Sequence, residues 1–384
     1  MQTGLRWLIY CCVAAILFSC TLGKKIAGVS SVSNISAIKL LDEYDIPHNL
    51  IFKNTTVGGL SGIDYDSANN CYYIICDDRS DINPARFYTA KINITSKGID
   101  SAYFTAVTNL LQSNGNVYPN NLQAPTLTPD PEAIRYNPIL HQMIWSSEGE
   151  RIVKKKDTIL EDPAISLISP EGKYIGSFEL PHLFKMQSIQ KGPRQNGVFE
   201  GMSFADNYKT LYANAEEPLY EDGPRADLTD NHAFIRILGY DVESRKNIKQ
   251  FAYKLDPIVY PANPPTEFKI NGVPDILSIG NDQLLVIERS YSFGHEGCSI
   301  RLFIADFKNA TDIKENVSLT KNAQFKPMTK KLLLNLDDLG IFIDNVEGMT
   351  FGPILPNGHR TLILIADNNF KQEERSQVFL FEVL

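Results

Sequence analysis

The feature that most constrains this chain is a short pattern that occurs five times. Each copy begins with a polar residue, continues with alternating apolar positions, passes through a turn rich in Asn, Asp, Gly or Pro, and ends in an apolar run followed by polar residues. The leading polar residues are separated by 71, 68, 75 and 72 positions, a spacing that predicts a repeat architecture. They are Ser61, Glu132, Glu200, Asp275 and Glu347.

Each copy predicts a β-hairpin of two short strands. Ile134 and Tyr136, for example, alternate with other residues at the period of a strand, and a Gly or Ala after most leading residues suits close backbone approach. Long helical patterns are missing from the sequence, and loops such as Leu110–Asp130 and Pro218–His232 lengthen the repeat. The sequence therefore predicts an all-β fold, a β-propeller of about five repeated units with five to seven blades.

The two ends of the chain together supply one more interval of the repeat. From Glu347 to the C-terminus is 37 positions, and from Cys20 to Ser61 is 41. A circular arrangement in which the terminal segments complete the ring explains both lengths. We expect residues 21–50 to contain a linker and the first strand or strands, and residues 51–384 to form the propeller domain.

Residues 1–20 predict a signal peptide with a lipobox. The apolar stretch "WLIYCCVAAILFSC" follows Arg6 and is too short to span a bilayer well. It ends in Leu17-Phe18-Ser19-Cys20, which resembles the cleavage site of a bacterial lipoprotein. We expect export and lipidation of Cys20, which places the protein on a periplasmic or outer-membrane surface; an ordinary cleaved signal and secretion are the alternative.

The composition argues against several kinds of site. The net charge is −8 and no basic stripe is visible, which disfavours nucleic-acid binding. The six His and the scattered Cys show no spacing typical of a transition-metal site. Cys71 and Cys76 lie at the two ends of one expected strand and cannot bridge one another, whereas a disulfide from either to Cys298 is left open.

The polar residues at the two ends of each hairpin should meet at one mouth of the ring. Sixteen positions separate Glu132 from Glu148 and Glu200 from Glu216, which is room for two strands and a turn that return the chain to the same sheet edge. The acids gathered in this way are Asp77, Asp78, Glu132, Glu148, Glu200, Glu216, Glu217, Asp275, Glu288, Glu347 and Asp367.

Carboxylates so crowded repel one another unless positive charge lies among them. Hard oxygen ligands without His or Cys suit calcium, with magnesium as the alternative. The predicted metal ligands are Asp77, Asp78, Glu132, Glu148, Glu200, Glu216, Glu347 and Asp367. The basic residues Arg79, Arg151, Arg289 and Lys371 follow the second-strand acids. They are candidate phosphate ligands, and the competing interpretation is a ring of structural salt bridges without metal.

Several blocks around the hairpins are long and occur in a fixed order. They include "GGLSGIDYD", "DPEAIRY", "RQNGVFEGMSF" and "DNVEGMTFGP", and they run from about Gly58 to the C-terminus. These blocks resemble the phytase-like family, also called esterase-like activity of phytase. The resemblance implies a secreted or periplasmic β-propeller related in concept to calcium-dependent propeller phytases. The fourth copy departs from the pattern, with Asp275-Ile276 in place of Glu-Gly, so its carboxylate is a candidate for a structural role.

The leading hypothesis for function is a calcium-assisted phosphoric-ester hydrolase, acting on phytate or another small phosphorylated substrate. Glu132, Glu200 and Glu347 would serve as ligands or general base, and Arg79 and Arg289 would hold phosphate oxygens. A metal-dependent lactonase or carboxylic esterase and a non-catalytic binding propeller at the cell surface are the alternatives. No G-x-S-x-G motif is present, which disfavours a serine esterase. We expect a monomer whose contact with the membrane is its lipid anchor.

Overall fold

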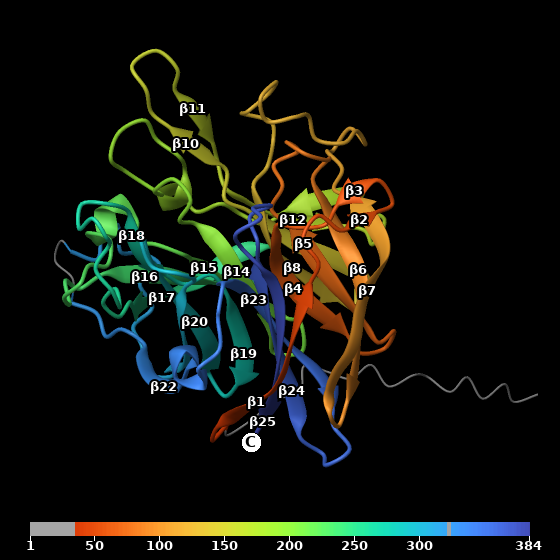
Figure 1. Ribbon diagram of the computed structural model, residues 1–384. Coiled ribbons are helices and arrows are strands. Elements are labelled where there is room, and N and C mark those ends of the chain that lie inside the picture. Colours follow the sequence, from red (N-terminus) through yellow and green to blue (C-terminus); the bar gives the residue numbers. More distant parts are fainter. Residues whose placement is uncertain (1–34, 321–323) are drawn as a thin grey trace, which may run out of the picture.

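The computed structural model describes residues 35–320 and 324–384. The predicted signal peptide and Cys20 lie outside the described residues. Within those ranges the chain forms five blades around a common axis, so the predicted all-β propeller is confirmed and the number of blades is five (Figure 1). In the same ranges, no helix combines the length and the apolar character that crossing a membrane requires.

The first three blades are four-stranded antiparallel sheets. Blade one consists of β4 (Leu60–Asp66), β5 (Cys71–Cys76), β6 (Arg86–Thr95) and β7 (Gly98–Asn109). Blade two consists of β8 (Pro131–Asn137), β9 (Gln142–Ser147), β12 (Ala164–Ile168) and β13 (Tyr174–Ser177). Blade three consists of β14 (Phe199–Ala205), β15 (Thr210–Ala215), β16 (Phe234–Asp241) and β17 (Lys246–Lys254).

Blades four and five depart from this simple order. Blade four consists of β18 (Lys269–Gly272), β19 (Ile276–Gly280), β20 (Gln283–Ser292), β21 (Ser299–Asp306) and β22 (Thr329–Asn335). The long strand β20 pairs with β19 along one half and with β18 along the other. Blade five consists of β23 (Asn345–Ile354), β24 (Arg360–Asp367), β25 (Ser376–Val383) and the N-terminal β1 (Ile38–Ile46).

The ring is closed by pairing the two ends of the described chain. Strand β1 runs antiparallel to β25, with Ile38 opposite Val383 and Ile46 opposite Ser376. The strand expected within residues 21–50 is therefore the outer strand of the last blade. This closure ties the first described strand to the last one, so that the two ends of the described chain are held in one blade.

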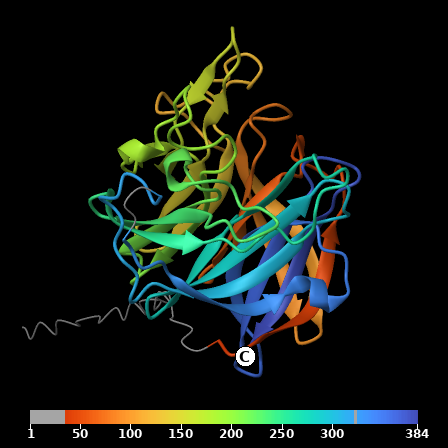
Figure 2. The same cartoon turned by 90° about the vertical axis from the view of Figure 1, so that its left-hand side faces the viewer.

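Short elements lie between the blade strands. They are β2 (Ile51–Phe52) with β3 (Thr55–Thr56), β10 (Glu150–Ile152) with β11 (Ile159–Glu161), and the 3-10 turns η1 (His182–Phe184), η2 (Tyr220–Asp222) and η3 (Leu336–Leu339). The β10–β11 hairpin stands above the blades, at the end of the molecule away from the C-terminus, in both views (Figures 1 and 2).

The hydrophobic core is divided among the interfaces between neighbouring blades. Ile134 of blade two packs with Ile75 of blade one, for example, and Val346 of blade five packs in one cluster with Leu285 of blade four. Because inward and outward side chains alternate along each strand, each blade offers apolar residues to both neighbours. Burial between the sheets is thus what holds the blades in a ring.

The innermost strands approach one another closely, which explains the small residue after four of the five leading positions. A Cβ on Gly62 of β4 would lie 2.7 Å from the carbonyl oxygen of Glu132, and one on Gly348 of β23 would lie 2.8 Å from that of Ser61. A larger side chain at these positions would collide with the backbone of the adjacent blade. The close backbone approach predicted from the sequence is confirmed at both glycines.

A buried ion pair on the axis connects the five blades. Arg135 on β8 donates to the carbonyl oxygens of Ile63 on β4 and Met202 on β14, each at 2.6 Å. Its guanidinium also binds both carboxylate oxygens of Asp275, at 2.7 and 2.8 Å. Asp275 directly precedes β19 and accepts a hydrogen bond from the backbone N–H of Met349 on β23, at 2.8 Å. Asp275 therefore has the structural role that its departure from the repeat suggested.

Candidate functional site: an acidic mouth

A cavity of about 990 Å³ opens at the end of the propeller where the first strand of each hairpin begins and the second ends. Glu132 on β8, Glu200 on β14 and Glu347 on β23 all line it. The hairpin argument predicted that these three carboxylates share one mouth, and their positions confirm it. We call this cavity, with the acids around it, the acidic mouth.

The last residues of the second strands also reach the acidic mouth, and blade four differs from the others. Asp77, Glu148 and Glu216 follow β5, β9 and β15 and line the cavity, whereas blade four contributes Arg289. The predicted acid Glu288 lies on the opposite face of β20, fully buried, where it accepts hydrogen bonds from Tyr253 and Asn271 at 2.8 Å each. The expectation that Glu288 belongs to the rim is wrong, because adjacent residues of a strand face opposite ways.

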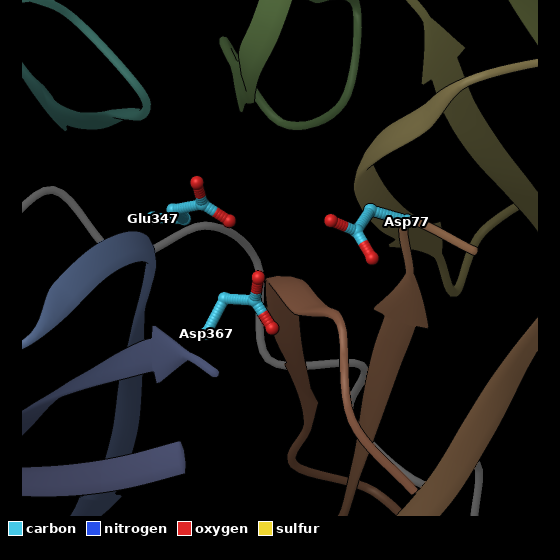
Figure 3. A group of neighbouring side chains, drawn as sticks. All are labelled: Asp77, Glu347 and Asp367. Atoms are coloured by element: carbon cyan, nitrogen blue, oxygen red, sulfur yellow. The ribbon is translucent and has the colours of Figure 1, made fainter. Parts of the chain in front are cut away.

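One group of three carboxylates lies where blades one and five meet. Oxygen atoms of Asp77, Glu347 and Asp367 come within 4.8 Å of one another, and the side chains converge from three different segments (Figure 3). Backbone N–H groups of Leu60 and Asn369 hold Asp367 in place, both at 2.9 Å. The second oxygen of Glu347, Oε2, is buried and has no hydrogen-bond partner among the described residues.

A second group of three carboxylates lies on blade two. Oxygen atoms of Asp130, Glu132 and Glu148 come within 4.8 Å of one another, and all three residues are buried. The Ser61 hydroxyl donates to Glu132 at 2.8 Å, and the Val198 N–H donates to Glu148 at 2.7 Å. Asp130 was missed by the sequence argument. Its position two residues before Glu132, in "DPEAIRY", places both side chains on one face of an extended segment and could have indicated it.

The acidic mouth is electrostatically strained when its acids are ionised. Burial raises the pKa of Glu148 to about 8, and that of Asp367 to about 8, with neighbouring carboxylates adding to both shifts. Burial and the same repulsion raise the pKa of Glu132 and Glu200 well above the usual range of a glutamate. The fold therefore holds these groups together at a cost that protons or cations would relieve.

Part of this charge is balanced by one arginine. The guanidinium of Arg289 binds Glu216 at 2.7 Å, pairs closely with Oε1 of Glu347, and donates to Asn345 at 2.6 Å. The competing interpretation of a salt-bridge ring thus applies at this point of the mouth. In the described part of the chain, Glu347 is the member of the first group that pairs with an arginine, and Asp130, 3.7 Å from Arg79, is the member of the second.

Asp78, Arg79 and Arg151 do not line the cavity, whereas Lys371 does. Asp78 is buried against Arg86 at 2.7 Å and caps the backbone of residues 81–83, so it is not brought into the acidic mouth. Arg79 pairs with Glu150 at the base of β10 and lies 3.7 Å from Asp130. Arg151 donates to the carbonyl oxygens of residues 187 and 189. Lys371 lines the cavity and pairs with Glu374 at 2.6 Å.

The donor chemistry of the two groups fits a hard divalent cation. Each group offers three carboxylate oxygens from separate side chains, without any His or Cys, as calcium prefers. Oε2 of Glu347 is a candidate ligand atom, because residues 35–320 and 324–384 offer it no hydrogen-bond partner. The free thiols of Cys71, Cys76 and Cys298 belong to neither group.

A family model described as phytase-like, esterase-like activity of phytase, matches residues 55–370. The chain belongs to the phytase-like family. The match includes strands of all five blades of this phytase-like protein and every member of the two carboxylate groups, and it leaves β1 and β25 of blade five outside. No curated protein matches the chain.

Solved structures with a similar arrangement share little sequence with this phytase-like protein. A GH43_12 retrieved from capybara gut metagenome is 15% identical, with 90% of this chain and 57% of that chain covered and a TM-score of 0.40. The endo-arabinase from Bacteroides thetaiotaomicron VPI-5482 is 11% identical, with coverage of 85% and 94% and a TM-score of 0.42. The periplasmic gluconolactonase PpgL of Pseudomonas aeruginosa is 10% identical, with coverage of 86% of each chain and a TM-score of 0.34.

Proposed function

We propose that this phytase-like protein is a calcium-assisted hydrolase of phosphoric esters, with its reaction at the acidic mouth. The observation that carries the proposal is the pair of carboxylate groups on one cavity, beside the guanidinium of Arg289. Asp77, Glu347 and Asp367 would hold one cation, and the group formed by Asp130, Glu132 and Glu148 would hold another.

Calcium bound by these groups would neutralise phosphoryl oxygens and lower the pKa of an attacking water. Arg289 is positioned to orient the ester, because its side chain lines the cavity between Glu216 and Glu347. A guanidinium suits this task since its fork matches two phosphate oxygens. Lys371, with 58% of its side chain exposed, would attract the anion at the outer edge of the cavity.

Glu200 is the candidate general base. It lines the same cavity and belongs to neither carboxylate group. In the proposed step, Glu200 accepts a proton from water as the water oxygen bonds to phosphorus, and the bond from phosphorus to the leaving oxygen breaks. The leaving oxygen then takes a proton from solvent. The products are the alcohol and the phosphate.

One observation favours the second candidate, a metal-dependent lactonase or carboxylic esterase. Among the described residues, eleven acidic side chains and three basic ones line the cavity. Such a surface repels strongly charged anions and accepts an uncharged ester more easily. The third candidate is a propeller that binds a ligand without catalysis, and an activity assay distinguishes it from the two hydrolases.

The test is ester hydrolysis by metal-stripped protein, with calcium returned or withheld. The panel contains phytate, an aryl phosphate, a phosphodiester, a lactone and a carboxylic ester. We expect phosphate release that requires calcium and that Glu200→Gln lowers about 100-fold or more, since a general base contributes at least that factor. The matched control is Glu315→Gln, at a side chain that is 90% exposed. Calcium-dependent cleavage of the lactone alone would select the second candidate, and no cleavage of any ester would refute both.

A further inference from the structure

One side of the acidic mouth is aromatic rather than acidic. The β18–β20 ladder extends blade four past the buried Asp275, with Ile270 opposite Tyr291. Phe268, Ile270 and Tyr291 all line the cavity, and so does Arg289. Because residues two apart on a strand face the same way, these side chains form one surface that continues directly from the guanidinium. We call Phe268, Ile270 and Tyr291 the aromatic wall.

The two rings of the aromatic wall contact one another but are left partly exposed. The rings of Phe268 and Tyr291 lie 6.1 Å apart, and Phe268 remains 53% exposed. At the edge of the cavity next to it, the His295 ring stacks on Tyr260 at 5.1 Å with an interplanar angle of 15°. A large apolar side chain left half exposed inside a concave site is typical of a ligand contact.

The charge of the cavity limits what else the substrate can carry. When all eleven acids that line it among the described residues are ionised, they exceed the three bases by eight charges. Two divalent cations would offset half of that excess. A ligand with many phosphates, such as phytate, would therefore meet a surface that is still negative.

We propose that the preferred substrate is an ester with one phosphoryl group and a planar aromatic alcohol, whose ring lies on the aromatic wall. This inference rests on the proposed function, because the phosphoryl group is placed by Arg289 and the carboxylate groups. The ring would cover Phe268 and Tyr291, while the buried Ile270, opposite Tyr291 on the neighbouring strand, adds apolar surface. Phe268 and Tyr291 are thereby specificity-determining residues.

The test is equilibrium binding of two phosphonates that cannot be hydrolysed at the phosphorus–carbon bond. Phenylphosphonate and methylphosphonate are titrated by calorimetry into the full protein, loaded with calcium. We expect phenylphosphonate to bind about tenfold more tightly, a difference of about 1.4 kcal/mol, because its ring covers the aromatic wall. Phe268→Ala and Tyr291→Leu should each remove most of that preference and leave methylphosphonate affinity unchanged.

The matched control is Phe293→Ala. Phe293 is 46% exposed, its backbone N–H donates to Phe268 at 2.9 Å, and its side chain does not line the cavity. Circular dichroism and thermal melting of all variants check folding. Phytate is titrated in the same buffer as the highly charged competitor.

The outcomes separate this inference from the proposed function. Equal affinity for the two phosphonates, no binding of either, tighter binding of phytate, or an equal effect of Phe293→Ala would each overturn the aromatic wall as a subsite. Hydrolysis of all phosphate esters without preference for an aryl group would refute this inference and leave the proposed function standing. Aryl-selective binding without hydrolysis of any ester would refute the proposed function and support the subsite.

Discussion

Removing divalent cations from the acidic mouth should make the protein less stable as the pH rises. Burial raises the folded-state pKa of Glu148 and of Asp367 to about 8 each, and that of Asp130 to about 7. In the unfolded chain these groups titrate near their ordinary values of about 4. Between about pH 4 and about pH 8, the folded, cation-free protein therefore binds more protons than the unfolded chain. Its free energy of unfolding is largest near pH 4 and falls as the pH rises.

The expected change in the free energy of unfolding can be worked out from one carboxyl group. A carboxyl that stays protonated when folded and is ionised when unfolded costs about 1.4 kcal/mol per pH unit. From about pH 5 to about pH 7, Glu148 alone would lower the free energy of unfolding by about 3 kcal/mol in chelator. Calcium should reverse this trend, because it binds the ionised carboxylates of the native state and adds about 2.7 kcal/mol at a hundredfold excess over Kd.

Urea unfolding at several pH values, in calcium and in chelator, measures both effects. The difference between the free energies of unfolding in calcium and in chelator should grow as the pH rises. Glu148→Gln keeps an acceptor for the Val198 N–H, which now lies at 2.7 Å, and should remove about 1.4 kcal/mol per pH unit from the slope in chelator. Glu315→Gln should leave the slope unchanged. A chelated protein whose stability rises or stays level from about pH 5 to about pH 8 would refute the reasoning.

Two further predictions concern the axis and the N-terminus. Arg135→Met should lower the free energy of unfolding by about 3–5 kcal/mol in urea titrations, because it leaves the buried Asp275 without its partner. Adding Asp275→Leu should recover part of the loss. Equal stability of Arg135→Met and the wild type would contradict the role of this pair. Cys20→Ala, expressed in a host that processes lipoproteins, should leave the membrane fraction if Cys20 carries the proposed lipid anchor, and an unchanged distribution would disprove the anchor.

The architecture could be predicted because every copy of the repeat contains the local patterns that specify a β-hairpin. Alternation of apolar residues sets which side of a strand is buried, and turn residues set where it reverses. The same parity brings Glu132, Glu200 and Glu347 to one mouth. The number of blades was left open between five and seven, because the ring closes through the pairing of β1 with β25, residues that are far apart in the sequence.

What the sequence by itself determined is the all-β repeat, its small residues at the axis and an acidic end of the ring, since each depends on neighbours along one strand. The tertiary structure alone decided which acids act together. Asp78 turns to Arg86, blade four presents Arg289 where an acid was expected, and Asp130 joins Glu132 and Glu148. These choices depend on how separate blades face one another across the axis, and no local pattern carries that information.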